Sequence, residues 1–388
     1  MTHPLENNKL KITEIKLSNP HTLVPLNTEV EAKIEINLQN GQYAWYIYLE
    51  DVLIKKKPYS SNLRTVTIKL DKPGKYKLKG YAKDTKGNTT SLYARSISVY
   101  SQRGYKKSKS SIKDIYPSIN VPYERLDKIE FDSTNATMYS INYNNQTYDF
   151  LVKRDLNDPN LTVMGSGAYD SDKGDLPVFQ RHSWMHKIDG NVIYYNDPTL
   201  YLDKINIGWG QGTEEEFYLQ NISEILKSIA ENIGINHKNI LFYGSSAGGF
   251  MSLVLGGYVK GSSVLVNNPQ TIVPNYYEQH VNAMCSVSYN VFDYKKVNDK
   301  FKNRLDIRAF YKDINYVPNI YYMQNSACEH DMENHYIPFN LFYYEMRKSL
   351  KFNNLVSYLY WDNEAQHNPL DKKRTLDFIN KVKEMWLD

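Results

Sequence analysis

Apolar and polar residues alternate strictly in several short runs of the first hundred residues. Such runs occur at residues 29–38, 45–49, 66–70 and 76–82. An alternation with a period of two places the apolar side chains on one face of a β-strand. Residues rich in Gly, Pro and Asn separate the runs, and Asn40-Gly41 is expected to form a hairpin turn. The pattern predicts a small β-sandwich of six or seven strands.

A different pattern begins after residue 126, where short apolar runs alternate with helical periodicity. Strands are expected at residues 138–143, 148–153, 161–165, 191–196, 239–243, 263–267, 319–324 and 356–361. Thr213 and Glu216 have the spacing of a capping box, and the apolar stripe that follows them ends at Gly234. Strands that alternate with helices predict an α/β domain with a mostly parallel eight-stranded sheet.

The two patterns define the expected domains. We predict an immunoglobulin-like β-sandwich over residues 1–102, a basic linker over 103–125 and an α/β domain over 126–388. The positive side chains of the linker are Arg103, Lys106, Lys107, Lys109 and Lys113. They are compatible with peripheral association with an anionic membrane surface, and a solvated connector is the alternative.

Composition narrows the class of protein. The chain of 388 residues is 41% hydrophobic and 23% charged, and its mean hydropathy of -0.59 is that of a water-soluble protein. The first residues lack the apolar core of a secretory signal, so we expect a cytoplasmic protein. A net charge of +4 is too small to predict nucleic-acid binding. Two cysteines do not predict a disulfide framework or a zinc site, and no metal site is expected.

The strongest chemical signal is the pentapeptide Gly244-Ser245-Ser246-Ala247-Gly248. It lies between a predicted strand and an apolar helical segment, which is the context of a nucleophile elbow. The turn between strand and helix is sharp, so the positions two residues from the serine must be small. We therefore predict that Ser246 is a nucleophile.

A serine hydroxyl needs a base to accept its proton, and the base needs an acid to orient its ring. Behind such an elbow the acid and then the histidine follow the serine along the chain. Only His367 lies between the last strand and the last helix, so it is the predicted base. The predicted acid is Asp331, in the loop after strand 319–324, and Glu329 and Glu333 in the same loop are alternatives.

The oxyanion hole should combine the backbone N–H of Ala247 with an N–H from the loop after strand 161–165. That loop contains Gly165, Ser166 and Gly167, whose small side chains allow the backbone to approach a substrate oxygen. An ordinary glycine-rich turn is the alternative for this segment.

Residues 126–388 resemble the α/β-hydrolase superfamily. Four segments, 179–184 (FQRHSW), 196–199 (NDPT), 208–212 (GWGQG) and 242–249 (FYGSSAGG), are similar to bacterial capsular-polysaccharide biosynthesis proteins of that fold, some of which are capsule O-acetyltransferases. A more distant resemblance is to an accessory secretory-system protein that acetylates glycans on serine-rich adhesins. The resemblance implies a triad of Ser246, Asp331 and His367, with no bound cofactor and with acetyl-CoA as the donor substrate.

Three further residues are candidates for substrate binding. Arg181 and Trp184 follow the predicted oxyanion loop, where Arg can hold an anionic group and Trp can stack on a sugar. Trp209 lies between two glycines and has the same potential. A structural role is the equal alternative for all three. The aromatic and basic segment 275–316 is expected to form a plain helical insertion, with a lid over the site as the alternative.

The predicted function is acyl transfer through Ser246 from acetyl-CoA to a polysaccharide or glycan acceptor. A carbohydrate esterase with the same residues is the first alternative, because water can replace the sugar hydroxyl. A catalytically inactive glycan-binding or assembly subunit is the second. The sequence is compatible with a homo-oligomer but does not define one.

Overall fold

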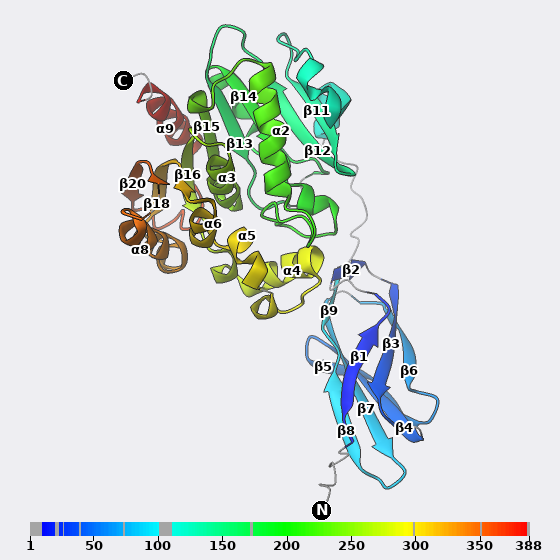
Figure 1. Cartoon of the computed structure of the whole chain (residues 1–388). Helices are drawn as coiled ribbons and strands as arrows, with labels where there is room; N and C mark the ends of the chain where they lie inside the picture. The colour runs from blue at the N-terminus through cyan, green and yellow to red at the C-terminus, as the bar shows by residue number, and fades with distance from the viewer. Residues whose placement is uncertain are drawn as a thin grey trace, which may run out of the picture. The chain divides into compact units, whose positions relative to one another are not determined.

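The chain divides into two compact units, Met1–Lys106 and Lys107–Asp388. The structure, a computed structural model, describes residues 10–19, 23–25, 27–38, 40–72, 74–100, 111–170, 174–297, 299–349 and 351–385. Figure 1 shows the first unit in blue and cyan and the second in green to red. No helix in these ranges is both long and apolar enough to cross a bilayer.

The first unit consists of strands. They are β1 Ile12–Leu17, β2 Leu23–Pro25, β3 Thr28–Ile36, β4 Gly41–Leu49, β5 Val52–Ser60, β6 Thr65–Leu70, β7 Gly74–Asp84, β8 Thr89–Tyr93 and β9 Ile97–Tyr100. One sheet has the order β1-β3-β6, and the other has the order β2-β9-β7-β4-β5 with β8 paired to β7. Inward-facing side chains of both sheets form one hydrophobic core, which includes Ile34 and the buried Trp45. The immunoglobulin-like type of this unit stays a prediction.

The hairpin expected at Asn40-Gly41 is not formed. Strand β3 pairs with β1 and β6, whereas β4 pairs with β5 and β7, so the chain crosses from one sheet to the other between them. The alternation of apolar residues correctly marks the buried face of β3, but it does not specify which strand pairs with which.

The second unit is built on a nine-stranded mixed sheet of order β10-β11-β12-β14-β13-β15-β16-β18-β20. The strands are β10 Ser118–Pro122, β11 Thr137–Tyr143, β12 Gln146–Lys153, β13 Leu161–Gly165, β14 Asn191–Tyr195, β15 Ile240–Ser246, β16 Ser263–Pro269, β18 Asn319–Asn325 and β20 Leu355–Tyr360. Strand β12 runs antiparallel to both of its neighbours, and the other neighbouring strands are parallel. Two short strands, β17 Tyr316–Val317 and β19 Lys351–Phe352, form a separate pair.

Helices cover both faces of this sheet. The α-helices are α1 Ile112–Ile115, α2 Tyr218–Asn232, α3 Ala247–Tyr258, α4 Glu278–Tyr289, α5 Lys302–Leu305, α6 Ile307–Ile314, α7 Glu329–Asp331, α8 Ile337–Met346 and α9 Lys372–Glu384. Short 3-10 helices are η1 Tyr123–Lys128, η2 His182–Lys187, η3 Pro198–Tyr201, η4 His237–Asn239, η5 Val273–Asn275, η6 Tyr294–Lys296 and η7 Asp299–Phe301, and η8 Met332–Tyr336 is a π-helix.

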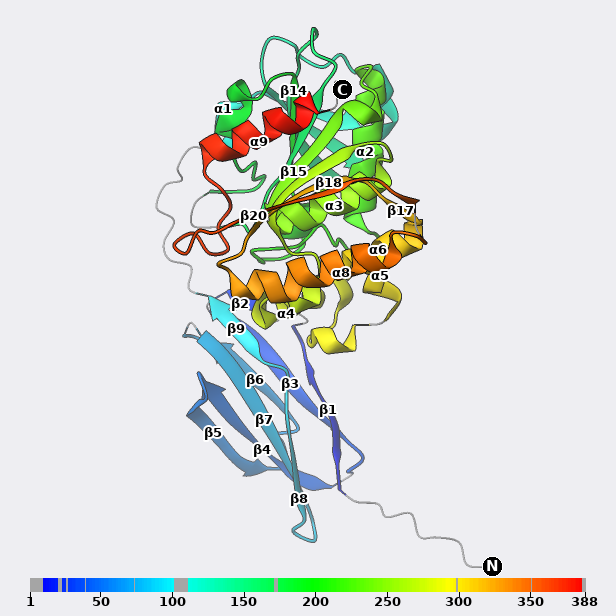
Figure 2. The same ribbon diagram turned by 90° about the vertical axis from the view of Figure 1, so that its left-hand side faces the viewer.

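Alternate residues of the central strands enter two different cores. Val163 and Ile193 pack with residues of α2, α3 and α6, whereas Met164 and Tyr194 pack with residues of η2 and α9. Figure 2 shows α9 on the side of the sheet that faces the viewer. Burial on both faces explains why these central strands are continuous apolar runs.

The predicted boundaries need two corrections. The sheet has nine strands and not eight, because β10 pairs in parallel with β11. This strand and α1 lie inside the expected linker 103–125, so the linker is shorter than predicted. Of its basic residues Lys113 lies in α1, whereas Arg103, Lys106, Lys107 and Lys109 lie outside the described residues.

The predicted capping box does not begin α2. The Thr213 hydroxyl accepts a hydrogen bond from the Glu216 N–H at 3.1 Å, which closes a turn before the helix. Helix α2 begins at Tyr218, with Phe217 at the N-cap position and no side-chain cap. Its apolar stripe is buried as expected, and it ends before Gly234, which has a positive φ of 71°.

Candidate active site

Ser246 stands at the junction of β15 and α3 in a strained backbone conformation. Its φ is 55° and its ψ is -124°, a region that residues other than glycine rarely adopt. A Cβ on Gly244 would lie 2.1 Å from the Gly248 carbonyl oxygen, and one on Gly248 would lie 2.9 Å from the Gly165 carbonyl oxygen. Both glycines are therefore required by close backbone contacts, and they fix the turn that presents Ser246.

The structure brings Ser246, His367 and Asp331 together. The Ser246 Oγ lies 2.9 Å from His367 Nε2, and His367 Nδ1 lies 2.7 Å from Asp331 Oδ2. Because an ionised carboxylate only accepts hydrogen bonds, the proton of neutral His367 is assigned to Nδ1. Nε2 is then free to accept the serine proton, which is the arrangement a general base needs.

Of the three carboxylates in the loop after β18, only Asp331 contacts His367 among the described residues. It is 1% exposed at the end of α7, whereas Glu329 and Glu333 are exposed. Burial raises the pKa of Asp331, but the hydrogen bond from His367 and the nearby charges outweigh it, so the pKa is below its usual value. Asp331 is therefore ionised near neutral pH and can stabilise a protonated His367.

Buried asparagines, which the sequence prediction missed, hold the loop that carries His367. The Asn268 side chain donates to the carbonyl oxygens of His367 and Asn368 at 3.0 and 3.1 Å. The Asn325 side chain donates to the carbonyl oxygens of Asp362 and Gln366 at 2.7 and 2.8 Å. Both asparagines are fully buried at the ends of β16 and β18, so the carboxyl ends of these two strands are tied directly to this loop.

A second missed residue, Gln270, contacts the serine itself. Its Nε2 donates to Ser246 Oγ at 3.0 Å, and its Oε1 accepts from the indole N–H of Trp209 at 2.6 Å. Trp209 is 0% exposed, so its ring is not available for stacking on a sugar. Of the two alternatives left open by the sequence, burial favours the structural one. The signal in the sequence is the group of polar residues Asn267, Asn268, Gln270 and Thr271 directly after an apolar strand.

The loop after β13 lies against the elbow. The Gly165 and Ser166 carbonyl oxygens pack against Gly248, and a Cβ on Gly167 would lie 4.0 Å from Ser246 Cβ. The Gly167 N–H donates to Gln180 Oε1 at 2.9 Å, so this N–H is engaged. Ala247 is the first residue of α3, where a backbone N–H has no acceptor within the helix. The loop after β13 and the start of α3 therefore lie beside Ser246, and their role as an oxyanion hole stays a prediction.

Arg181 lies behind the elbow. Its guanidinium donates to Ser245 Oγ at 2.8 Å and stacks over the rings of Trp184 and Tyr243. The Trp184 ring is also covered by Lys372. These contacts are with the protein itself, and they position the residue before the serine; contact of Arg181 or Trp184 with a substrate stays a prediction.

The segment 275–316 forms a helical insertion. Helix α4 buries Val281, Met284 and Cys285 against the main core, so the segment is part of the folded unit. Tyr276, at its start, lies next to the site, with ring centroids 6.0 Å from His367 and 5.9 Å from Trp209.

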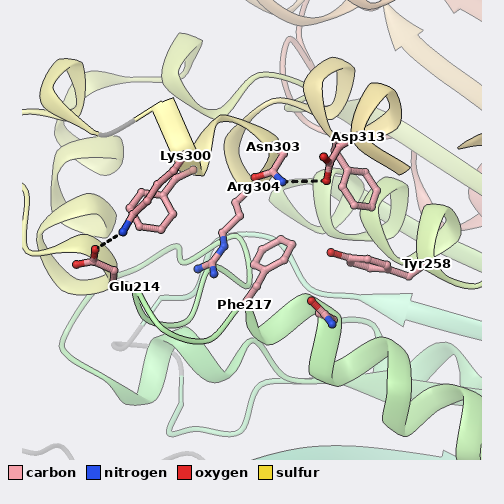
Figure 3. A pocket seen from close by; sticks show the side chains of 10 residues that line it. Glu214, Phe217, Tyr258, Lys300, Asn303, Arg304 and Asp313 are labelled. Carbon is pink, nitrogen blue, oxygen red and sulfur yellow. Dashed lines mark hydrogen bonds and ion pairs between the residues drawn. The ribbon is translucent and has the colours of Figure 1, made fainter. Parts of the chain in front are cut away.

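A separate pocket of about 370 Å³ lies between α2 and the insertion. Figure 3 shows Arg304 and the Lys300–Glu214 ion pair on its wall, with Phe217 and Tyr258 nearby. None of its lining residues belongs to the group around Ser246. The pocket is therefore distinct from the candidate active site.

Comparison with solved structures finds proteins with a similar backbone. The capsule O-acetyltransferase of Neisseria meningitidis serogroup A has 15% identity and a TM-score of 0.45, over 66% of this chain and 97% of that one. A chain of the Gap123 glycosylation-associated complex from Streptococcus agalactiae has 13% identity and a TM-score of 0.45, over 97% and 72%. The S-formylglutathione hydrolase of Agrobacterium tumefaciens has 13% identity and a TM-score of 0.46, over 66% and 96%.

No family model matches the chain, and no curated protein matches it either. The chain is thus similar in structure to capsule O-acetyltransferase, Gap123 and hydrolase-type enzymes, at low identity. Similarity at this level does not define an activity, which has to be inferred from the side chains of this chain.

Proposed function

We propose that this chain is a serine-dependent acyltransferase of the α/β-hydrolase fold, which O-acetylates a cell-surface or capsular polysaccharide through an acyl-enzyme on Ser246. The observation that carries the proposal is the continuous hydrogen-bonded path from Ser246 Oγ through His367 to Asp331, at 2.9 and 2.7 Å. The path supplies a nucleophile, a base and a buried acid in the order that acyl transfer requires.

In the first half-reaction, Ser246 Oγ attacks the carbonyl carbon of the acetyl thioester while His367 Nε2 takes the serine proton. Asp331 stabilises the imidazolium that forms. The negative charge on the carbonyl oxygen is stabilised by the N–H of Ala247 at the start of α3 and by the adjacent loop after β13. Collapse of the tetrahedral intermediate breaks the C–S bond, and His367 gives its proton to the departing thiolate of coenzyme A.

In the second half-reaction, a sugar hydroxyl takes the place of the thiol. His367 accepts its proton, the sugar oxygen attacks the acetyl carbon, and the bond to Ser246 Oγ breaks as His367 returns the proton to the serine. Water in place of the sugar gives hydrolysis by the same steps. The choice of acetyl-CoA and of a polysaccharide rests on the sequence resemblance of segments 179–184, 196–199, 208–212 and 242–249.

The covalent intermediate provides the direct test. A brief pulse of acetyl-CoA, followed by acid quenching and intact-protein mass spectrometry, should add one acetyl group to the wild-type chain. Peptide mapping should place the group on Ser246, and Ser246→Ala should remain unmodified. As a control, Ser91→Ala removes an exposed hydroxyl of β8 in the first unit and should still be acetylated.

Acceptor addition then separates transfer from hydrolysis. Polysaccharide should speed the loss of the acetyl group from Ser246, and O-acetyl signals should appear in the NMR spectrum of the polymer. Loss of the group at the same rate with and without polysaccharide would indicate an esterase instead. Absence of any acyl-enzyme, with correctly folded protein, would overturn the proposal.

A further inference from the structure

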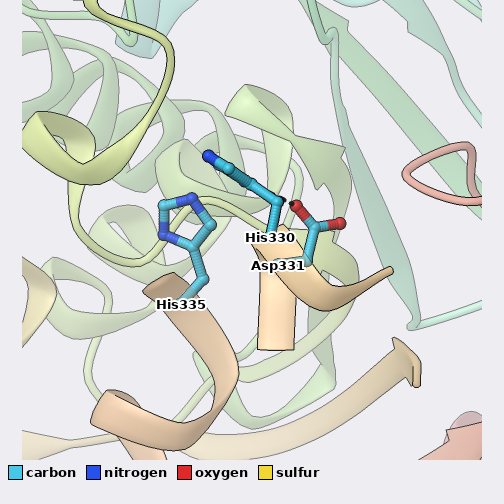
Figure 4. Close-up of side chains that lie close together, drawn as sticks. All are labelled: His330, Asp331 and His335. Atoms are coloured by element: carbon cyan, nitrogen blue, oxygen red, sulfur yellow. Dashed lines mark ion pairs between the residues drawn. The ribbon is translucent and has the colours of Figure 1, made fainter. Parts of the chain in front are cut away.

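Two histidines, which the mechanism does not use, lie on the far side of Asp331. One ligand atom from each of His330, Asp331 and His335 lies within 4.8 Å of the other two. Figure 4 shows the three side chains close together, with His330 and Asp331 on α7 and His335 on η8. The Oδ2 atom of Asp331 contacts His367, whereas its Oδ1 atom lies 3.6 Å from His330 Nδ1. One carboxylate oxygen of Asp331 therefore faces His367, and the other faces His330.

His335 is an unusual histidine. Its side chain is 0% exposed, and neither ring nitrogen has a hydrogen-bond partner among the described residues. A buried polar group without a partner costs about 1–3 kcal/mol. Both nitrogens of this buried ring are therefore available to bind a ligand.

The π-helix η8 explains why these groups meet. An ordinary α-helix places residues three or four apart on one face, whereas the wider π turn aligns residues five apart. His330 and His335 are five positions apart in the chain. His330 lies in α7, and His335 lies in η8, which follows α7 directly. The wide turn thus brings the His335 side chain close to Asp331. Such π turns occur often at functional sites.

We propose that His330, Asp331 Oδ1 and His335 form a binding site for a divalent transition-metal cation, with Zn²⁺ as the favoured ion. Two imidazole nitrogens and one carboxylate oxygen are a common three-residue zinc set, which leaves the fourth position for water. The sequence predicts no metal site because its two cysteines are too few and too isolated to form one.

The site needs a small contraction to bind the ion. Ligand atoms at about 2.0–2.2 Å from a tetrahedral zinc lie roughly 3.3–3.6 Å apart, and the longest separation here is within 4.8 Å. His330 can make this adjustment because its side chain is 28% exposed. Its ring stacks on the ring of Tyr277, which is 51% exposed, at 4.7 Å between centroids.

An ion bound here acts on the acid of the catalytic group. Its positive charge faces Asp331 and opposes a second positive charge on His367, which must form when the serine proton is transferred. The cation therefore slows acyl transfer and makes the site sensitive to zinc. This effect on rate rests on the proposed function, whereas binding of the ion does not.

Binding is tested on untagged, metal-free, full-length protein by calorimetric titration with Zn²⁺. One ion should bind per chain, and His330→Ala and His335→Leu should each weaken binding by about tenfold or more. The Leu variant should remain folded, because both nitrogens of the replaced ring lack partners. Glu333→Gln changes an exposed side chain of the same π turn and should bind as the wild type does.

Co²⁺ offers a second readout. Bound Co²⁺ should give visible ligand-field absorption of tetrahedral type in the wild type and in Ser246→Ala, and should lose it in His330→Ala. Saturable binding that is unchanged in both folded histidine variants would overturn the site, as would the absence of saturable binding.

Rate measurements complete the test. Zn²⁺ should inhibit acetylation of Ser246 in the wild type and leave His330→Ala insensitive. If no acyl-enzyme forms at all, the proposed function fails while the binding experiments still decide the metal site. If Zn²⁺ binds at the histidines and the rate of acetylation is unchanged, the regulatory effect is excluded.

Discussion

The loop that carries Ser246 and the loop that carries His367 are held in place by different means. The elbow is fixed by contacts between residues a few positions apart, chiefly the packing of Gly244 on Gly248. The histidine loop is fixed by the side chains of Asn268 and Asn325, which lie 99 and 41 residues from the carbonyl groups they bind. The first is a local structure, and the second depends on the whole sheet.

This difference predicts different responses to mutation. A change in the elbow should disturb the backbone of the turn and therefore the folding of the α/β unit. A change around His367 should leave the fold intact and alter only the orientation of the His367 ring. Four substitutions separate the two cases.

The largest effect is expected for His367→Ala. Without the base, kcat should fall by about 10⁴-fold or more, as for other enzymes that lose one triad member. The thermal unfolding temperature should stay within a few degrees of the wild type, because the side chain is 29% exposed. His186→Ala removes an exposed histidine of η2 and serves as the control. Retention of full acetylation by His367→Ala would exclude it as the base.

The next effect concerns stability. Gly244→Ala places a Cβ 2.1 Å from the Gly248 carbonyl oxygen, and the unfolding free energy should fall by about 3 kcal/mol or more. Gly174→Ala is the matched control, because no atom lies within 4 Å of its added Cβ. Denaturant unfolding measures both. An unfolding midpoint of Gly244→Ala equal to that of Gly174→Ala would show that the elbow is not locally fixed.

The third effect addresses the histidine loop. Asn268 has a positive φ of 46°, so Asn268→Gly removes its amide without backbone strain. We expect kcat to fall about 10- to 100-fold, from a loss of about 1.5–3 kcal/mol of hydrogen bonding to the loop. Asn290→Gly, at the C-cap of α4 with a φ of 53°, is the control and should retain kcat. Equal kcat values for the two variants would contradict the proposed anchoring.

The smallest effect is expected for Trp209→Phe. The Gln270 Oε1 loses its donor, so kcat should fall about fivefold for roughly 1 kcal/mol. Trp45→Phe removes an equally buried indole N–H, which donates to the Leu63 carbonyl oxygen at 2.8 Å in the first unit. Both variants should lose stability, and only Trp209→Phe should lose activity. Loss of activity in both would show that the indole acts through general stability.

The sequence predicts the local part of the site well and the long-range part poorly. The elbow is a contiguous motif, and His367 follows from the order of the last strand and helix. Ser246, Asp331 and His367 do meet in the structure, although their catalytic role stays a prediction. The sequence does not predict the roles of Asn268, Asn325 and Gln270. The role of a buried amide depends on its hydrogen-bond partners, and these partners are distant in the chain.

The same contrast between local and long-range features holds for the prediction of the fold. All eight strands expected after residue 126 are present. The central ones are continuous apolar runs because they are buried on both faces, whereas β20 has an apolar sequence although it is mostly exposed. Strand β10 was missed because it is flanked by Pro117 and ends at Pro122, and only one of its five residues is buried. Such a strand lies at a sheet edge, where proline is tolerated and apolar patterning is weak. Pairing of β3 with β6 was not predictable from alternation alone.

The positive φ of Ser246 also limits which residues can replace this serine during evolution. A residue branched at Cβ is strongly disfavoured in that backbone region. Threonine is therefore not expected at this position, although it carries a hydroxyl group as serine does. Cysteine is unbranched and fits the same turn. Descendants of this scaffold can therefore exchange oxygen for sulfur at the nucleophile, but they cannot exchange a primary alcohol for a secondary one.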